Sequence, residues 1–130
     1  MLWLRAEGLA VLLLSLVLYA EHGRGWLLLF GLLLAPDLSM IGYLGGPRPG
    51  ALVYNLFHTY TAPLLLATAA LPLQQPLLIS LSLIWSAHIG MDRCLGYGLK
   101  LPGGFRDTHL GRIGKPPATA PPERSAPPLA

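Results

Sequence analysis

The feature that most constrains this chain is a set of four long apolar runs, separated only by short polar or proline- and glycine-rich segments. A helix needs about 20 mostly apolar residues to cross the hydrocarbon core of a membrane, and each run approaches that length. Because the connecting segments are short, consecutive helices should pack antiparallel to one another. The runs therefore predict an all-α membrane protein, a four-helix antiparallel transmembrane bundle with helices near residues 3–20, 26–44, 52–71 and 76–92.

The composition favours lipid over water as the surrounding solvent. Hydrophobic residues make up 53% of the chain and charged residues only 12%, which is about half the charged share of a soluble domain. A 14.0 kDa soluble fold has too little interior to bury so many apolar side chains, so the expected partner is the lipid bilayer. The net charge of +3 does not indicate a nucleic-acid partner, since the basic residues flank apolar runs and gather toward the C-terminus.

The basic residues also predict an orientation. In an antiparallel bundle both termini and the loop around residues 45–50 lie on one side, and the turn at residues 21–25 lies on the other. The second side holds only Arg24, whereas the first holds Arg5, Arg48, Arg93, Lys100, Arg106, Arg112, Lys115 and Arg124. Loops rich in lysine and arginine stay in the cytoplasm. We therefore expect a multi-pass protein of the inner (plasma) membrane with both termini cytoplasmic.

The C-terminal part is expected to lie outside the membrane. Residues 93–115 are basic and glycine-rich and predict a cytoplasmic loop, which completes a transmembrane domain at 1–115. Residues 116–130 are mostly proline and alanine, and such a segment buries too little apolar surface to become ordered. The single cysteine, Cys94, allows no disulfide within the chain and no paired-cysteine metal site.

Four polar residues recur near the predicted cytoplasmic ends of the helices: Asp37, His58, His88 and Asp92. An ionisable side chain at the membrane centre costs roughly 2.5–3.5 kcal/mol, and less near the interface. These residues should therefore turn inward and meet. His88 and Asp92 are four residues apart, which places them on one face of a helix.

Two histidines and two aspartates form a suitable ligand set for zinc, manganese or iron. A metal there could polarise a phosphoryl or carbonyl group or acidify a bound water. Asp107 and His109, in the cytoplasmic loop, are candidates for a catalytic acid or base that closes over the site. No zinc-protease, serine-nucleophile, P-loop or dinucleotide motif occurs in the chain.

Other interpretations remain open at this stage. Asp37 follows Pro36 and could simply cap a helix, His88 and Asp92 could be a hydrogen-bonded pair, and Tyr97 and Lys100 could be interface anchors. The leading hypothesis is a metal-dependent, hydrolase-like enzyme that acts on a lipid-associated or phosphorylated substrate. The alternatives are a non-catalytic membrane protein or subunit, whose polar cluster only packs the helices, and a carrier of protons or small molecules.

Four segments carry a resemblance to a known family: PDLSMIGY, YNLFHTY, HIGMDRCLGYGLK and FRDTHLG. Together they resemble the small bacterial membrane proteins grouped as domain-of-unknown-function 4260, over about Leu4–Lys115. The resemblance implies a four-helix membrane fold without an established activity. It also implies that the family's motif positions are Asp37, His58, His88, Asp92, Asp107 and His109.

A looser similarity is to predicted membrane-bound metal-dependent hydrolases, which carry PDxD, a TH-containing motif and HxxxD in that order. Pro36-Asp37, His58-Thr59 and His88 with Asp92 follow the same order here. Ser39 replaces the second aspartate of the first motif, and the order of histidine and threonine is reversed. These departures leave the number of metal ligands open.

Overall fold

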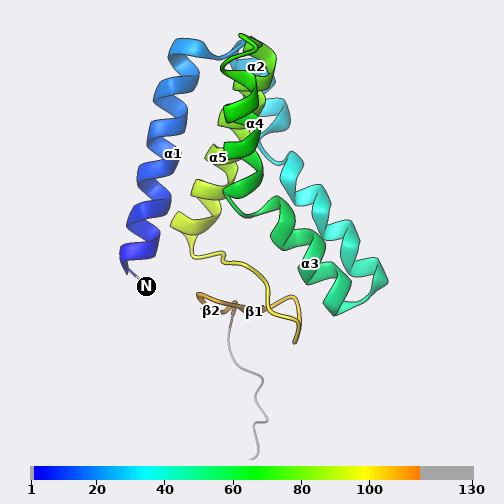
Figure 1. The fold of residues 1–130 in the computed structure, drawn as a ribbon. Helices are drawn as coiled ribbons and strands as arrows, with labels where there is room; N and C mark the ends of the chain where they lie inside the picture. The colour runs from blue at the N-terminus through cyan, green and yellow to red at the C-terminus, as the bar shows by residue number, and fades with distance from the viewer. Residues whose placement is uncertain (1, 115–130) are drawn as a thin grey trace, which may run out of the picture.

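The structure is a computed structural model that describes residues 2–114. It is mostly helical, as predicted, and a small β-hairpin that the sequence did not predict follows the last helix (Figure 1). The elements in chain order are α1 (Leu2–His22), α2 (Trp26–Leu32), the 3₁₀ helix η1 (Ala35–Gly45), α3 (Pro47–Phe57), α4 (Thr61–Ala70), α5 (Pro76–Leu95), β1 (Asp107–Thr108) and β2 (Gly111–Arg112). The predicted tail at 116–130 lies outside the described residues.

The helices form two groups. α1 lies beside α5 and runs antiparallel to it, and α4 packs on α5 (Figure 1). η1 and α3 pack on each other as a helical hairpin that leans away from this first group. The first group has a small apolar core around Tyr19, Leu29 and Ile84. The two groups meet where the second and third apolar runs are interrupted.

A proline causes each interruption. Pro36 has no N–H to donate to the carbonyl of Leu32, where α2 ends, and the chain continues as η1. Pro63 in the same way cannot donate to the carbonyl of Thr59, and α3 ends just before that residue. The prediction of one continuous helix at 52–71 is therefore wrong, because a short turn divides this segment into α3 and α4.

The loop predicted at 45–50 is also wrong, because α3 already begins at Pro47. Gly46 precedes the helix with a φ of 110°, a left-handed conformation that glycine adopts at little cost. Pro47 and Pro49 then lie in the first turn, where N–H groups have no acceptor within the helix. Residues that commonly form a loop thus start a helix here.

Two glycines allow α1 and α5 to approach closely. A Cβ on Gly8 would lie 2.9 Å from the Gly90 carbonyl oxygen, and a Cβ on Gly90 would lie 2.8 Å from the Gly8 carbonyl oxygen. Small residues at a helix crossing permit this kind of backbone approach. Since Gly90 lies between His88 and Asp92, the crossing also fixes the part of α5 that carries polar residues.

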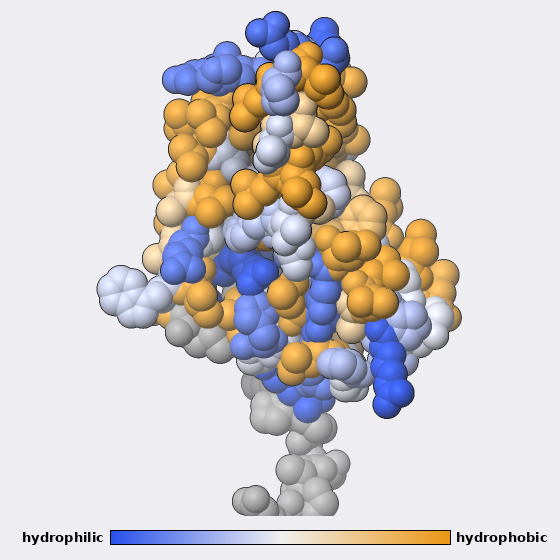
Figure 2. All heavy atoms as spheres, in the orientation of Figure 1, coloured by the Kyte–Doolittle hydropathy of each residue, from blue (hydrophilic) through white to orange (hydrophobic). Residues whose placement is uncertain are grey.

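Among residues 2–114, two segments are long and apolar enough to cross a membrane: α1, with 21 residues, and the 20-residue segment Trp26–Gly45 that α2 and η1 form together. Large apolar side chains cover much of the face seen in Figure 2, and hydrophilic residues gather at its upper end and in its lower half. Leu27 and Leu44 are almost fully exposed, at 88% and 89%. So much exposed apolar surface is unusual for a soluble monomer.

Candidate metal centre

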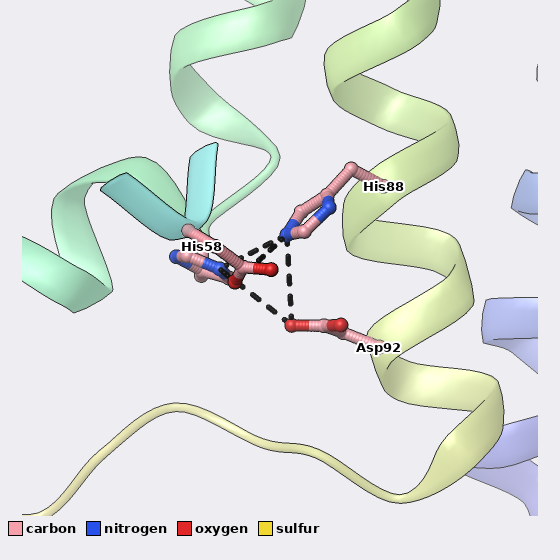
Figure 3. A group of neighbouring side chains, drawn as sticks. His58, His88 and Asp92 are labelled. Carbon is pink, nitrogen blue, oxygen red and sulfur yellow. Dashed lines mark hydrogen bonds and ion pairs between the residues drawn. The ribbon is translucent and has the colours of Figure 1, made fainter. Parts of the chain in front are cut away.

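Asp37, His58, His88 and Asp92 meet in one cluster between the two groups of helices. Each offers one ligand atom, and these four atoms lie within 4.8 Å of one another. In Figure 3, His58 projects from the bend after α3 toward His88 and Asp92, which project from α5. The structure therefore brings together the four residues that the sequence singled out as metal ligands.

The two interruptions supply two members of this cluster. Asp37 lies in the first turn of η1, directly after the buried Pro36. His58 is the residue at which α3 ends, with φ −113° and ψ 16°. His88 and Asp92 come from the unbroken α5 and lie one turn apart on its buried face.

Helix α5 also holds the bend around His58 in place. The Trp85 indole N–H donates to the carbonyl of Phe57 at 2.7 Å, and the Ser82 hydroxyl donates to the carbonyl of Pro63 at 2.9 Å. Interrupting a helix frees carbonyl groups that need donors when they are buried. Trp85 provides the donor for the carbonyl of Phe57, the last residue of α3, and Ser82 ties the first turn of α4 to α5. Helix α5 therefore holds the chain on both sides of the bend.

The distances from the two imidazole nitrogens to the other ligand atoms are close to those of a coordination shell. His88 Nε2 lies 3.1 Å from His58 Nε2, 3.5 Å from Asp37 Oδ1 and 3.8 Å from Asp92 Oδ2. His58 Nε2 lies 3.4 Å from Asp37 Oδ1 and 3.6 Å from Asp92 Oδ2. Ligands of a tetrahedral ion with bonds of about 2.0–2.1 Å lie roughly 3.3–3.4 Å apart. All five distances are within about half an ångström of that spacing.

Hydrogen bonds outside the cluster orient His58. Its Nδ1 lies 2.9 Å from the carbonyl oxygen of Tyr54, and because a carbonyl only accepts, Nδ1 must carry the proton. In the neutral imidazole, Nε2 then presents its lone pair to the centre of the cluster. Tyr54 also stacks on the His58 ring, with centroids 3.7 Å apart, and donates its hydroxyl to Asp92 Oδ2 at 3.2 Å. Such second contacts commonly orient metal ligands.

His88 is the most deeply buried member of the cluster, with no exposed surface. Its Nδ1 is buried and has no hydrogen-bond partner among residues 2–114. Its Nε2 points at three atoms that can all act as acceptors: His58 Nε2, Asp37 Oδ1 and Asp92 Oδ2. Acceptors gathered at one point need a proton or a cation between them.

A pocket of about 330 Å³ reaches the cluster from the side of the carboxylates. The Asp37 side chain is 33% exposed and that of Asp92 13%, whereas both imidazoles are buried. Solvent therefore reaches the carboxylates and not the histidines. The pocket is lined by Asp37, Met40, Tyr54, Asp92, Tyr97, Lys100, Phe105 and Ile113.

Lys100 is the residue of this site that the sequence interpretation missed. It is only 3% exposed, and Asn55 bonds its backbone on both sides: Lys100 N–H donates to Asn55 Oδ1 at 2.6 Å, and Asn55 Nδ2 donates to the Lys100 carbonyl at 2.8 Å. Its Nζ lies 4.1 Å from the ring centroid of Phe105 and 5.0 Å from that of Tyr54. Burial lowers the pKa of Lys100, and the charges of Asp92 and Asp37 partly oppose this shift.

Asp107 and His109 lie outside the cluster and outside the lining of the pocket, as far as residues 2–114 show. Asp107 forms an ion pair with Arg112 across the β-hairpin, with Oδ1 and Nε 3.7 Å apart. His109 Nδ1 accepts the Leu99 N–H at 2.8 Å. Both side chains thus hold the C-terminal segment together, and their acid or base role stays a prediction.

The fold and the site define a class: small, mostly helical proteins with two segments apolar enough to cross a membrane and a buried histidine–aspartate cluster where helices break. Within this class, the chain belongs to the family described as Domain of unknown function (DUF4260), whose model matches residues 1–113. The expected family is thereby confirmed, and its description names no activity. No curated protein and no solved structure matches the chain.

Proposed function

We propose that the protein is an integral membrane enzyme that binds a divalent transition metal at Asp37, His58, His88 and Asp92 and hydrolyses its substrate there. One observation carries the proposal: the lone pair of His58 Nε2 points into a group of four ligand atoms that lie within 4.8 Å of one another, and the imidazole nitrogens lie 3.1–3.8 Å from the other members. Two imidazoles and two carboxylates suit zinc, manganese or iron.

An ion held by these residues would polarise a phosphoryl or carbonyl oxygen and acidify a bound water. The protein's own residues determine where this chemistry takes place. The imidazoles close the site on the buried side, and Asp37 and Asp92 face the pocket. Substrate would therefore have access from the carboxylate side.

The membrane part of the proposal rests on length, apolarity and the course of the chain. α1 is about as long as the hydrocarbon core is thick, and exposed leucines surround the helices. In Figure 1 the N-terminus, the η1–α3 turn and the β-hairpin lie at the lower end, and the α1–α2 turn lies at the upper end. In the proposed orientation the lower end, which is rich in arginine, faces the cytoplasm.

A second pocket favours a substrate with an apolar part. It has a volume of about 230 Å³ and lies beside the cluster, because Pro36 and Phe57 in its wall directly precede Asp37 and His58. An acyl chain suits this environment, which favours a lipid-associated substrate. Its lining is apolar: Leu32, Ala35, Pro36, Phe57, Leu66, Leu81, Ile84 and Trp85.

The test is the metal content of the protein, purified in detergent without a chelator or a histidine tag. Elemental analysis should find about one transition-metal ion per chain, and His88→Ala should lose most of it, because a site of four protein ligands has few to spare. Affinity should fall below about pH 6, where histidine protonates. His22→Ala is the control, since His22 is exposed and near Glu21 rather than the cluster.

The second candidate function is structural, and the contact between the two Nε2 atoms at 3.1 Å favours it. A proton on one ring would make this contact an interhelical hydrogen bond. In that case His88→Ala should weaken the bundle by about 0.6 kcal/mol, the average for such a bond, and the wild-type protein should hold no metal. A metal-free wild-type protein would therefore overturn the enzyme proposal and leave the structural one.

A further inference from the structure

The pocket at the cluster contains a buried cation without a carboxylate partner. No carboxylate among residues 2–114 forms an ion pair with Lys100, although the residue is only 3% exposed. Aromatic rings of Phe105 and Tyr54 flank the ammonium group. These rings attract a cation but do not accept its three N–H bonds as an oxygen would. The ammonium group is thus available to an anion that enters the pocket.

Contacts of the Lys100 backbone hold the residue so that its side chain faces the pocket. The two hydrogen bonds of Asn55 hold its backbone, and it pairs with Thr108 in a β-bridge. The neighbouring Leu101 is exposed, so the extended segment turns its lysine inward and its leucine outward. Asn55 is therefore a positioning residue for Lys100.

The charges of the pocket determine what it can bind. Its charged lining residues are Asp37, Asp92 and Lys100. A divalent ion bound at the cluster would neutralise both carboxylates, and Lys100 would then give the pocket a net positive charge. Phosphate oxygens are strong acceptors for an ammonium group and also bind divalent ions, so both contacts favour the same group.

We propose that Lys100 binds the phosphate group of the substrate, beside the metal ligands Asp37 and Asp92. The inference rests on the proposed metal site, which supplies the second contact. It narrows the substrate class to phosphate esters. A phosphate ester of a lipid and a soluble phosphate compound share this chemistry, and the apolar pocket beside the cluster favours the lipid.

The test uses full-length protein in an uncharged detergent, loaded with manganese, and inorganic phosphate as the probe. Isothermal titration calorimetry should show saturable binding by the wild-type protein, and the Kd should rise at least tenfold in Lys100→Met. The control is Arg48→Met, which removes the same charge from an exposed position and should leave the Kd unchanged. Metal content should be equal in all three proteins. Lys100→Gln replaces Lys100→Met if that variant loses its metal through misfolding.

The outcomes separate the two proposals. A wild-type protein that takes up no manganese would overturn the metal site and the phosphate site together. A protein with stoichiometric metal whose phosphate affinity is the same in Lys100→Met would overturn the phosphate site alone. Displacement of phosphate by a single-chain phosphatidate at tenfold lower concentration would assign a lipid headgroup. Failure of the phosphatidate to displace phosphate would assign a soluble phosphate compound, again with Lys100 as its contact.

Discussion

At His58 the main chain and the side chain act together. The end of α3 places the residue at the bend, and the carbonyl of Tyr54 receives both its backbone N–H at 3.0 Å and its Nδ1 at 2.9 Å. The same tyrosine stacks on the imidazole and reaches Asp92 with its hydroxyl. One residue outside the ligand set thus orients two of the ligands.

This arrangement predicts the effect of Tyr54→Phe. The variant keeps the stacked ring and the backbone carbonyl but loses the hydroxyl that donates to Asp92. Loss of such an outer contact typically lowers metal affinity about 10- to 100-fold, and competition with a chromogenic chelator would measure the change. Tyr60→Phe is the control, since the Tyr60 hydroxyl is buried without a partner in the described part of the chain. An equal loss in both variants would contradict this role for Tyr54.

At the scale of the helices, the α1–α5 crossing determines where His88 and Asp92 lie. A methyl group at position 90 would lie 2.8 Å from both the Gly8 carbonyl oxygen and the Leu12 nitrogen. Since these are backbone atoms, the helices would have to separate. Overpacking of this kind costs about 1–3 kcal/mol.

Gly90→Ala should therefore lower the thermal unfolding midpoint in detergent and reduce the metal content in the same preparation. Gly31→Ala is the matched control, because nothing lies within 4 Å of a Cβ at that position of α2. Alanine favours a helix over glycine by up to about 1 kcal/mol, so the control should be as stable as the wild-type protein or more so. A Gly90→Ala protein with unchanged midpoint and metal content would show that the close crossing does not support the site.

At the scale of the whole molecule, the proposed orientation predicts which ends are accessible. A reporter fused after Ala130 should behave as cytoplasmic and one inserted at residues 21–25 as external, since that turn holds Arg24 alone and the sequence assigns the other basic residues to the opposite side. The protein should also stay with the membrane during an alkaline carbonate wash. The reverse reporter pattern, or release by carbonate, would contradict the orientation or the membrane insertion.

The parts of this structure that could be predicted depend on contacts close in sequence or on apolar length. The helices at 3–20 and 76–92 follow from apolar runs and match α1 and α5 closely. Helical spacing places His88 and Asp92 on one face of α5. The cost of exposing these residues to lipid predicts that they lie close to Asp37 and His58. These arguments need no knowledge of how distant side chains pack.

The parts that were not predicted depend on contacts between residues distant in sequence, or on prolines that are compatible with more than one local structure. Pro47 and Pro49 are as compatible with a loop as with a first helical turn. Predicting the break before α4 would have required giving Pro63 more weight than the continuous apolar character of residues 52–71. The buried position of Lys100 involves Asn55, 45 residues earlier, which binds its backbone, and no local pattern in the sequence indicates such a contact.

The most direct test of the central claim is X-ray absorption spectroscopy at the edge of the metal that the purified protein carries. Two histidines and two aspartates predict a first shell of nitrogen and oxygen alone, at about 2.0–2.2 Å, with scattering from two imidazole rings. His88→Ala, reloaded with excess metal, should retain the signal of one ring. A shell that contains sulfur, or one without imidazole scattering, would place the metal elsewhere and contradict the account.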